Sequence, residues 1–257
     1  MKKVFLLLVV GLYFSLHAKG SNTDYNVLFD SANHLYQQSD FRGAISVYKS
    51  ISDSGYTSAE LFYNLGNSYF KTGEFPKAIL LYERSKVLEP SNPDIEFNLA
   101  KAKAYNVDQI ESIPEFIFNS WVRDLVGSLN SNAWAVMSLI TFFIAIISLI
   151  LYFLVARKAL RQTAFVTGII LLIVSVFFIK FSHTTKAYIE KSDYAIAMEP
   201  TISVKGSPDL GSVDLFLIHQ GTKVKVLRNL DEWSEIKLSD GKQGWLQSVD
   251  IEHVSMY

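Results

Sequence analysis

Residues 63–90 read YNLGNSYFKTGEFPKAILLYERSKVLEP, which predicts two amphipathic helices that meet at KTGEFP. Gly73 lets the chain turn after the first helix, and Pro76 suits the first turn of the second. Gly66 and Ala78 are small, so the two helices can approach each other closely. The stretch contains no catalytic pattern, and the hairpin is therefore predicted to serve packing or recognition.

The hairpin belongs to a pattern that recurs every 34 residues. The matching positions are Phe29, Tyr63 and Phe97; Ala32, Gly66 and Ala100; Ala44 and Ala78; and Tyr48 and Tyr82. This period and these residue types resemble the tetratricopeptide repeat. The second copy matches best, the first is weaker, and the third has only its first helix, at about residues 93–105. Because one hairpin cannot bury its apolar face, the copies within 21–106 are expected to stack, capped by the third-copy helix, whose Lys101 and Lys103 face water.

The resemblance implies a concave groove lined by the first helix of each copy. The residues expected to bind a partner there are Phe29, Asn33, Tyr63, Asn64, Asn67, Phe97 and Asn98. Asparagine amides can donate to and accept from a peptide backbone, so the set is interpreted as a groove for a partner segment. Taken singly, each aromatic could instead pack between repeats, and each asparagine could be an ordinary consensus residue. The basic residues by which some such repeats hold a terminal carboxylate are missing, since Phe29 and Asp94 occupy two of their places.

The whole chain is too apolar for an ordinary soluble protein. Hydrophobic residues make up 49% of the 257 residues and charged residues 19%, and the net charge is -1. This net charge argues against a bulk electrostatic attraction to nucleic acid. The chain has no cysteine, which excludes disulfides, thiolate zinc sites and thiol redox chemistry.

Two segments, 132–156 and 162–182, are predicted to be transmembrane helices. Each covers roughly the 20 residues that a helix needs to cross the hydrocarbon layer. The loop between them, 157–161, carries three positive charges and is expected on the cytoplasmic side. The interior of neither span holds an ionisable residue, which argues against a transport pathway or an intramembrane enzyme. Ser138 and Ser175 are interpreted as helix-packing residues.

Residues 1–20 are predicted to be a signal peptide. Two lysines precede an apolar run at 4–16, and Ala18 or Gly20 would precede the cut. A first transmembrane helix is the alternative, but the run is short for a span. Lysines also follow the second span, so the positive charges alone do not decide which side of the membrane each loop occupies. The signal peptide would export the region before the first span, so both soluble regions are expected on the non-cytoplasmic face.

Two linkers flank the predicted spans, at 107–131 and 183–193. Within the first, residues 114–129 repeat apolar side chains every four positions, with aromatics among them. An amphipathic helix of this kind can lie in the membrane interface. Equally, it can cover the last repeat helix, and the sequence leaves both interpretations open.

Residues 194–257 change to a period of two, which predicts short β-strands. Asp240-Gly241 is a strong hairpin signal, and Gly241, Gly244 and Trp245 form a Gly-x-x-Gly-Trp pattern. The segment resembles the bacterial SH3-like barrel. Such barrels bind peptides or cell-wall fragments through aromatics, and Trp233 and Trp245 are the candidates, although core filling is the alternative for both. His219 and His253 have no nearby ligand set for a metal.

The order of parts predicts a multidomain membrane protein, with all-α tetratricopeptide-repeat hairpins, two transmembrane helices and a small all-β SH3-like barrel. That order resembles the BatE family of bacterial aerotolerance-operon membrane proteins. The resemblance implies an inner-membrane protein with periplasmic soluble domains and partners from the same operon, some with von Willebrand A domains.

Three hypotheses follow for the function. The first is a non-enzymatic scaffold that needs no cofactor. The second is a sensor or targeting protein that binds peptidoglycan through the barrel. The third, a hydrolase, is the least favoured, because no segment remains for a catalytic domain.

Overall fold

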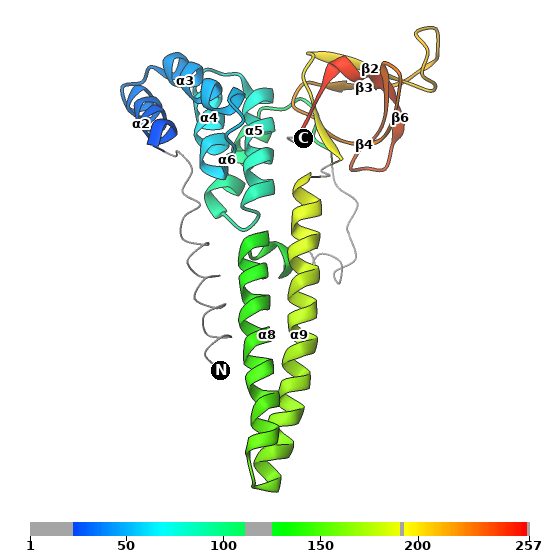
Figure 1. Ribbon diagram of the computed structural model, residues 1–257. Helices are drawn as coiled ribbons and strands as arrows, with labels where there is room; N and C mark the ends of the chain where they lie inside the picture. Colours follow the sequence, from blue (N-terminus) through cyan, green and yellow to red (C-terminus); the bar gives the residue numbers. More distant parts are fainter. Residues whose placement is uncertain (1–22, 111–124, 191–192, 256–257) are drawn as a thin grey trace. The chain divides into compact units, whose positions relative to one another are not determined.

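The computed structural model describes residues 23–110, 125–190 and 193–255 (Figure 1). The predicted signal peptide and most of the predicted amphipathic segment at 114–129 lie outside the described residues. The chain divides into two compact units, Met1–Thr57 and Ser58–Tyr257, and each is described by itself.

The described part of the first unit is a helical hairpin of α2 (Thr23–Gln37) and α3 (Phe41–Asp53). Asp40 caps α3, because its carboxylate accepts a hydrogen bond from the backbone N–H of Gly43 at 2.9 Å. The side chains buried in this hairpin are Ala32, Ala44, Tyr48 and Ile51. The weaker first copy of the repeat therefore forms two helices at the predicted places.

The second unit begins with three helices: α4 (Ala59–Lys71), α5 (Phe75–Leu88) and α6 (Pro93–Lys103). Gly73, between α4 and α5, has a φ of +81°, a left-handed conformation that favours glycine. A Cβ atom at Gly66 would lie 2.9 Å from the ring of Tyr82, so this close approach requires glycine. Ser85 stands where the repeat usually has alanine, and its hydroxyl donates to the carbonyl of Ala59 at 2.7 Å. The hairpin predicted from residues 63–90 is thus present, with its small residues at the helix contact.

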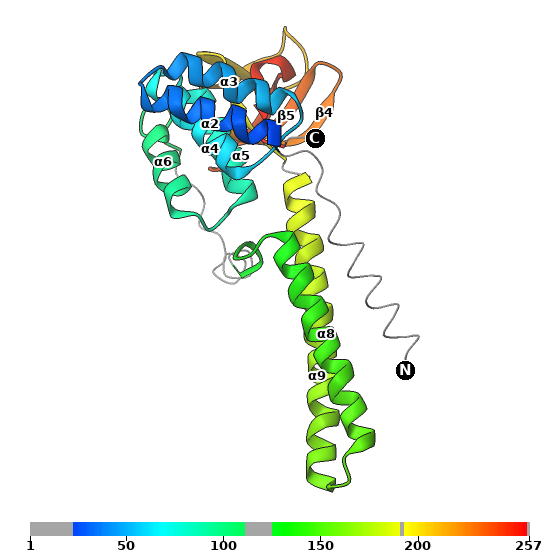
Figure 2. The same ribbon diagram turned by 60° about the vertical axis from the view of Figure 1, so that its left-hand side comes forward.

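Two long apolar helices, α8 (Ser131–Leu154) and α9 (Lys158–Glu190), run antiparallel side by side (Figures 1 and 2). By length and composition, Ser131–Leu154 and Lys158–Ala187 can each cross a membrane. Only residues 155–157 join them. The connection is shorter than the predicted loop at 157–161, because Lys158 and Arg161 already belong to the first turn of α9.

Serine hydroxyls join α8 to α9 at several levels. The hydroxyls of Ser138 and Ser175 each donate to the other residue's carbonyl at 3.1 Å. Ser131 and Ser182 form a second reciprocal pair, at 3.0 and 2.9 Å. Between apolar helices such hydrogen bonds fix the register of the pair, which agrees with the packing role predicted for Ser138 and Ser175.

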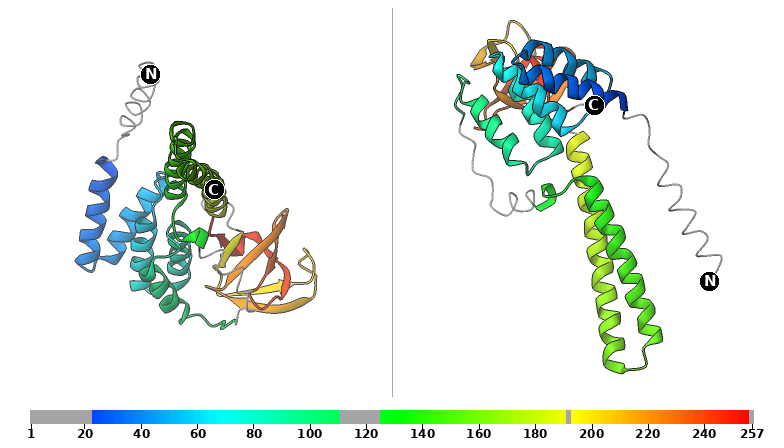
Figure 3. Two further views of the ribbon diagram at one scale, coloured as in Figure 1. Left: turned by 90° about the horizontal axis from the view of Figure 1, so that it is seen from below. Right: turned by 90° about the vertical axis from the view of Figure 1, so that its left-hand side faces the viewer.

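The rest of the second unit is a seven-stranded antiparallel sheet with the order β3-β2-β6-β5-β4-β1-β7, and its strands curl around a core (Figure 3). The strands are β1 (Tyr194–Ala197), β2 (Thr201–Lys205), β3 (Asp214–His219), β4 (Lys223–Leu230), β5 (Trp233–Lys237), β6 (Gln243–Gln247) and β7 (Ile251–His253). Gly241, with a φ of +94°, makes the predicted turn between β5 and β6. A Cβ atom at Gly244 would lie 2.6 Å from Val204, so β6 can approach β2 only with glycine there. The C-terminal segment is a small β domain, as its alternating pattern predicts.

Within the second unit the repeat helices pack against this sheet. One buried cluster combines Tyr82 of α5 and Leu99 of α6 with Ile196 of β1 and Val254, which follows β7. The sheet therefore covers apolar surface of α5 and α6. The sequence predicts α6 as the cap of the repeat and leaves residues 114–129 as a further possible cover, but it does not predict the contact with the sheet.

Candidate protein-binding surfaces

Three predicted groove residues of the second unit are joined by hydrogen bonds. The side-chain amide of Asn98 donates to the hydroxyl of Tyr63 at 2.7 Å and to Oδ1 of Asn67 at 3.0 Å. The hydroxyl of Tyr82 donates to the same Oδ1 at 2.7 Å. Because a carbonyl oxygen has two lone pairs, Asn67 has no acceptor capacity left on that atom. Asn67 therefore supports the surface, while Tyr63 is held in place by Asn98.

Asn64 and Phe97 complete the predicted set in the second unit. The backbone carbonyl of Asn64 accepts from the hydroxyl of Ser68 at 2.9 Å, and its side chain is half-buried. The side chain of Phe97, on α6, is 68% exposed. An exposed phenylalanine on the helix that also carries Asn98 is available for contact with a partner.

Phe29 and Asn33 lie on α2 in the first unit, so they are described apart from the other five. The ring of Phe29 meets the edge of the Tyr48 ring, with centroids 5.6 Å apart. The hydroxyl of Tyr48 donates to Oδ1 of Asn33, over the same separation of 15 residues that joins Tyr82 to Asn67. Each copy thus uses its asparagine to hold the tyrosine of its second helix. The shared spacing was a signal in the sequence for this packing role.

A small hollow lies between α4 and α6 in the second unit, with a volume of about 240 Å³. It is lined by Ala59, Glu60, Tyr63, Glu89, Asn92 and Ile95. The amide of Asn92 donates to the carboxylate of Glu89 at 3.0 Å. Tyr63 is the predicted groove residue that belongs to this hollow, and sequence reasoning did not identify the two glutamates.

The two tryptophans of the sheet lie on one face of it. Trp245 is opposite Glu235 in the register of β5 and β6, and Trp233 is two residues before Glu235. Trp245 is only 7% exposed, and the guanidinium of Arg228 lies 5.0 Å from its ring centroid. Ile236 and Leu246, which alternate with these residues, belong to the core. Trp245 is thus covered by Arg228 on the outer face, whereas Trp233 is half-buried and more accessible.

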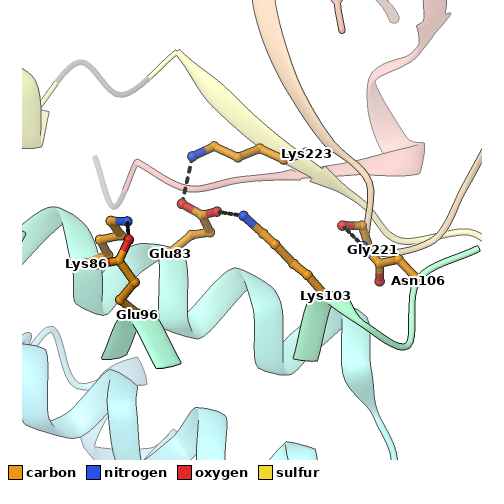
Figure 4. Close-up of polar contacts among 7 residues, drawn as sticks. All are labelled: Glu83, Lys86, Glu96, Lys103, Asn106, Gly221 and Lys223. Carbon is orange, nitrogen blue, oxygen red and sulfur yellow. Dashed lines mark hydrogen bonds and ion pairs between the residues drawn. The ribbon is translucent and has the colours of Figure 1, made fainter. Parts of the chain in front are cut away.

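A buried carboxylate joins the repeat to the sheet (Figure 4). The side chain of Glu83, on α5, is 5% exposed, and its two oxygens accept from the ammonium groups of Lys103 and Lys223, each at 2.7 Å. Burial opposes the ionisation of Glu83, but the nearby charges of Lys223 and Lys103 outweigh it and lower the pKa of Glu83 to about 2. Lys223 also lies over the ring of Tyr194, 4.3 Å from its centroid. Lys103 was predicted to face water; its side chain is 40% exposed, but its ammonium group pairs with the buried Glu83.

The chain that follows α6 binds the sheet as well. The amide of Asn106 donates to the carbonyl of Gly221 at 2.9 Å (Figure 4). The carboxylate of Asp108 accepts from the backbone N–H of His219 and from the hydroxyl of Thr222, both at 2.7 Å. Partial burial raises the pKa of Asp108, but the hydrogen bonds from Thr222 and His219 outweigh this and hold it below its usual value. The repeat and the sheet are therefore joined by charged and polar contacts on both α5 and the segment after α6.

Metal binding finds no support in the described parts of the chain. Across residues 23–110, 125–190 and 193–255, no group of three or more histidine, aspartate or glutamate side chains is placed to hold a metal ion.

One family pattern matches the chain. Residues 59–92 match the tetratricopeptide repeat, and they coincide with α4, α5 and the start of the turn to α6. A comparison with curated proteins found no match. The matched repeat indicates a role in protein–protein interaction in general.

Proposed function

We propose that this chain is a non-enzymatic scaffold of the bacterial inner membrane that assembles envelope proteins. The observation that carries the proposal is the face formed by α4 and α6. There Tyr63, which belongs to the matched tetratricopeptide repeat, lines a hollow and is held by Asn98 of α6, and α6 also carries the exposed Phe97. A pre-ordered face of this kind binds a partner segment at a lower entropic cost than a flexible one.

The two apolar helices supply the anchor in this proposal. The basic residues at the α8–α9 turn favour the cytoplasmic side for that turn. With an exported N-terminal region, the repeat and the SH3-like domain then both lie in the periplasm. This arrangement is that of the BatE-type proteins of aerotolerance operons, and it makes von Willebrand A domain proteins of the same operon the expected partners.

The contact between repeat and sheet supports a scaffold over a flexible tether. Glu83 is bonded to lysines of both modules, and a shared apolar cluster lies beside it. Two modules held in one body present their surfaces at a fixed spacing, and anchoring raises their effective concentration for partners in the same membrane.

The test is site-specific crosslinking. A photoreactive amino acid replaces Phe97 in the full chain, and crosslinked products are isolated from native membranes. The proposal expects one or a few envelope proteins in high yield. A control with the photoreactive residue at Lys49, on an exposed position of α3, should not capture the same proteins. If Phe97 captures no protein, the scaffold proposal fails.

A second candidate is peptidoglycan binding by the SH3-like domain. The accessible side of Trp233, beside Trp245 on one face of the sheet, favours it, since aromatic faces bind sugars and peptides. The detergent-solubilised full chain is mixed with purified peptidoglycan and sedimented. Retention that falls with Trp233→Ala supports this candidate, and no retention removes it.

A further inference from the structure

The hollow between α4 and α6 has the size and lining of a receptor for one side chain. Its volume of about 240 Å³ is below the roughly 300–1,000 Å³ of sites for drug-sized ligands. Ala59, Ile95 and the ring of Tyr63 give it an apolar part, and Glu60 and Glu89 add two carboxylates. We infer that it receives a lysine or arginine side chain of an extended partner segment, an inference that rests on the proposed scaffold function.

The charge pattern of the repeat supports a cationic ligand. The segment from α4 to α6 contains five glutamates: Glu60, Glu74, Glu83, Glu89 and Glu96. Glu74 pairs with Lys77, Glu83 with Lys103 and Lys223, and Glu96 with Lys86, all within 3.2 Å. Among the described residues, no lysine or arginine pairs with Glu60 or Glu89. The two glutamates without a cation are the two that line the hollow.

Glu89 is exposed and lies between α5 and α6. It is the C-cap residue of α5, where the negative end of the helix dipole disfavours a carboxylate. Its carboxylate accepts a hydrogen bond from Asn92, the N-cap residue of α6, but no lysine or arginine among the described residues pairs with it. A partner supplies that cation.

The apolar lining suits the stem of the same side chain. Lysine and arginine carry three or four methylene groups below the charge, and these pack well on an aromatic ring. Tyr63 offers such a ring, and its hydroxyl is held by Asn98 at 2.7 Å. A cation above a tyrosine ring gains a further attraction, roughly 0.5–2 kcal/mol in known cases. The stem contacts Tyr63 and Ile95, and the charged end reaches Glu60 and Glu89.

The experiment uses the full chain with the photoreactive residue at position 97, in native membranes. One variant carries Glu60→Lys and Glu89→Lys, a second carries Glu60→Gln and Glu89→Gln, and the control carries Glu232→Lys on an exposed turn of the sheet domain. Circular dichroism of each purified chain checks the fold, and the isosteric glutamine pair is used if the lysine pair misfolds. The captured segment is mapped by mass spectrometry.

The expected result is at least tenfold less capture with the lysine pair, several-fold less with the glutamine pair, and no change with Glu232→Lys. The mapped segment should carry a lysine or arginine within about three residues of the crosslink. When this basic residue of the partner is replaced by glutamate, the variant with Glu60→Lys and Glu89→Lys should capture the partner again. Unchanged capture by both pairs, or a segment without a basic residue, overturns the inference and leaves the scaffold proposal intact. If the chain that keeps both glutamates captures no protein, the inference and the scaffold proposal are both overturned.

Discussion

Replacing Glu83 by glutamine should loosen the sheet domain from the repeat. The side chain keeps its size but loses its charge, so Lys103 and Lys223 lose an ionic partner at 2.7 Å. The pKa of Glu83 falls from 4.5 to about 2 in the folded protein. One pKa unit corresponds to about 1.4 kcal/mol, so the ionised carboxylate contributes about 3 kcal/mol.

The measured loss should be smaller than this, about 2 kcal/mol. The two lysine side chains are 40% and 30% exposed, so they recover hydration once the carboxylate is gone. The ion pair of Glu96 with Lys86 is the matched control. Figure 4 shows it together with the contacts of Glu83. The Glu96 side chain is 69% exposed, and its replacement by glutamine should change stability by less than about 0.5 kcal/mol.

Hydrogen exchange in the full chain measures this directly. The backbone N–H of Val254 donates to the carbonyl of Tyr194 at 2.9 Å, and both residues belong to the cluster shared with α5. If Glu83→Gln lowers the free energy of opening this contact by about 2 kcal/mol, this amide exchanges about 30-fold faster. Glu96→Gln should leave it within about twofold.

The pH dependence gives a second readout with a definite sign. The pKa of Glu83 is lowered by folding, so its contribution is fully present above the unfolded value of 4.5. It is lost as the pH falls from 4.5 toward 2, and the Glu83→Gln variant lacks this loss. The reasoning is refuted if Glu83→Gln and Glu96→Gln exchange alike, or if the original chain gains protection as the pH falls through this window.

Three further predictions test the packing, the polar contacts and the topology. Gly66→Val should destabilise the α4–α5 hairpin by about 1–3 kcal/mol, because its Cβ would meet the tyrosine ring of α5 at 2.9 Å, and thermal unfolding followed by circular dichroism measures this. Asp108→Asn should speed exchange of the His219 amide about tenfold, since it removes the charged acceptor at 2.7 Å, and unchanged exchange would contradict the assigned contact. Reporter fusions should indicate the cytoplasm at Ala159 and the periplasm after Tyr257, and the same side for both would refute the hairpin topology.

Local sequence signals predicted the elements well. Gly73 and Asp240-Gly241 mark turns because few other residues adopt a positive φ, and both turns occur where expected. Gly66 was predicted to lie at a close contact between two helices, and the ring of Tyr82 leaves no room for a larger residue there. Each of these signals depends on a conformation or a contact within one hairpin, which a short stretch of sequence specifies.

The contact between the repeat and the sheet domain was not predicted, and the reason is physical. Glu83 sits 20 residues from Lys103 and 140 from Lys223. A glutamate in a helical pattern normally faces water, and nothing local distinguishes one that is buried by a distant module. The pairing of Lys103 with Glu83 was missed for the same reason. The groove residues stay predictions, although Asn33 and Asn67 have packing roles that their shared spacing from a tyrosine indicates.

The shortness of the α8–α9 connection has a consequence for the proposed membrane topology. Three residues, 155–157, separate the two apolar helices. In that topology this turn is the part of the described hairpin that faces the cytoplasm, and it offers little surface to a nucleotide or a folded protein. The scaffold proposal therefore expects a cytoplasmic signal to reach the repeats through another protein of the same bilayer.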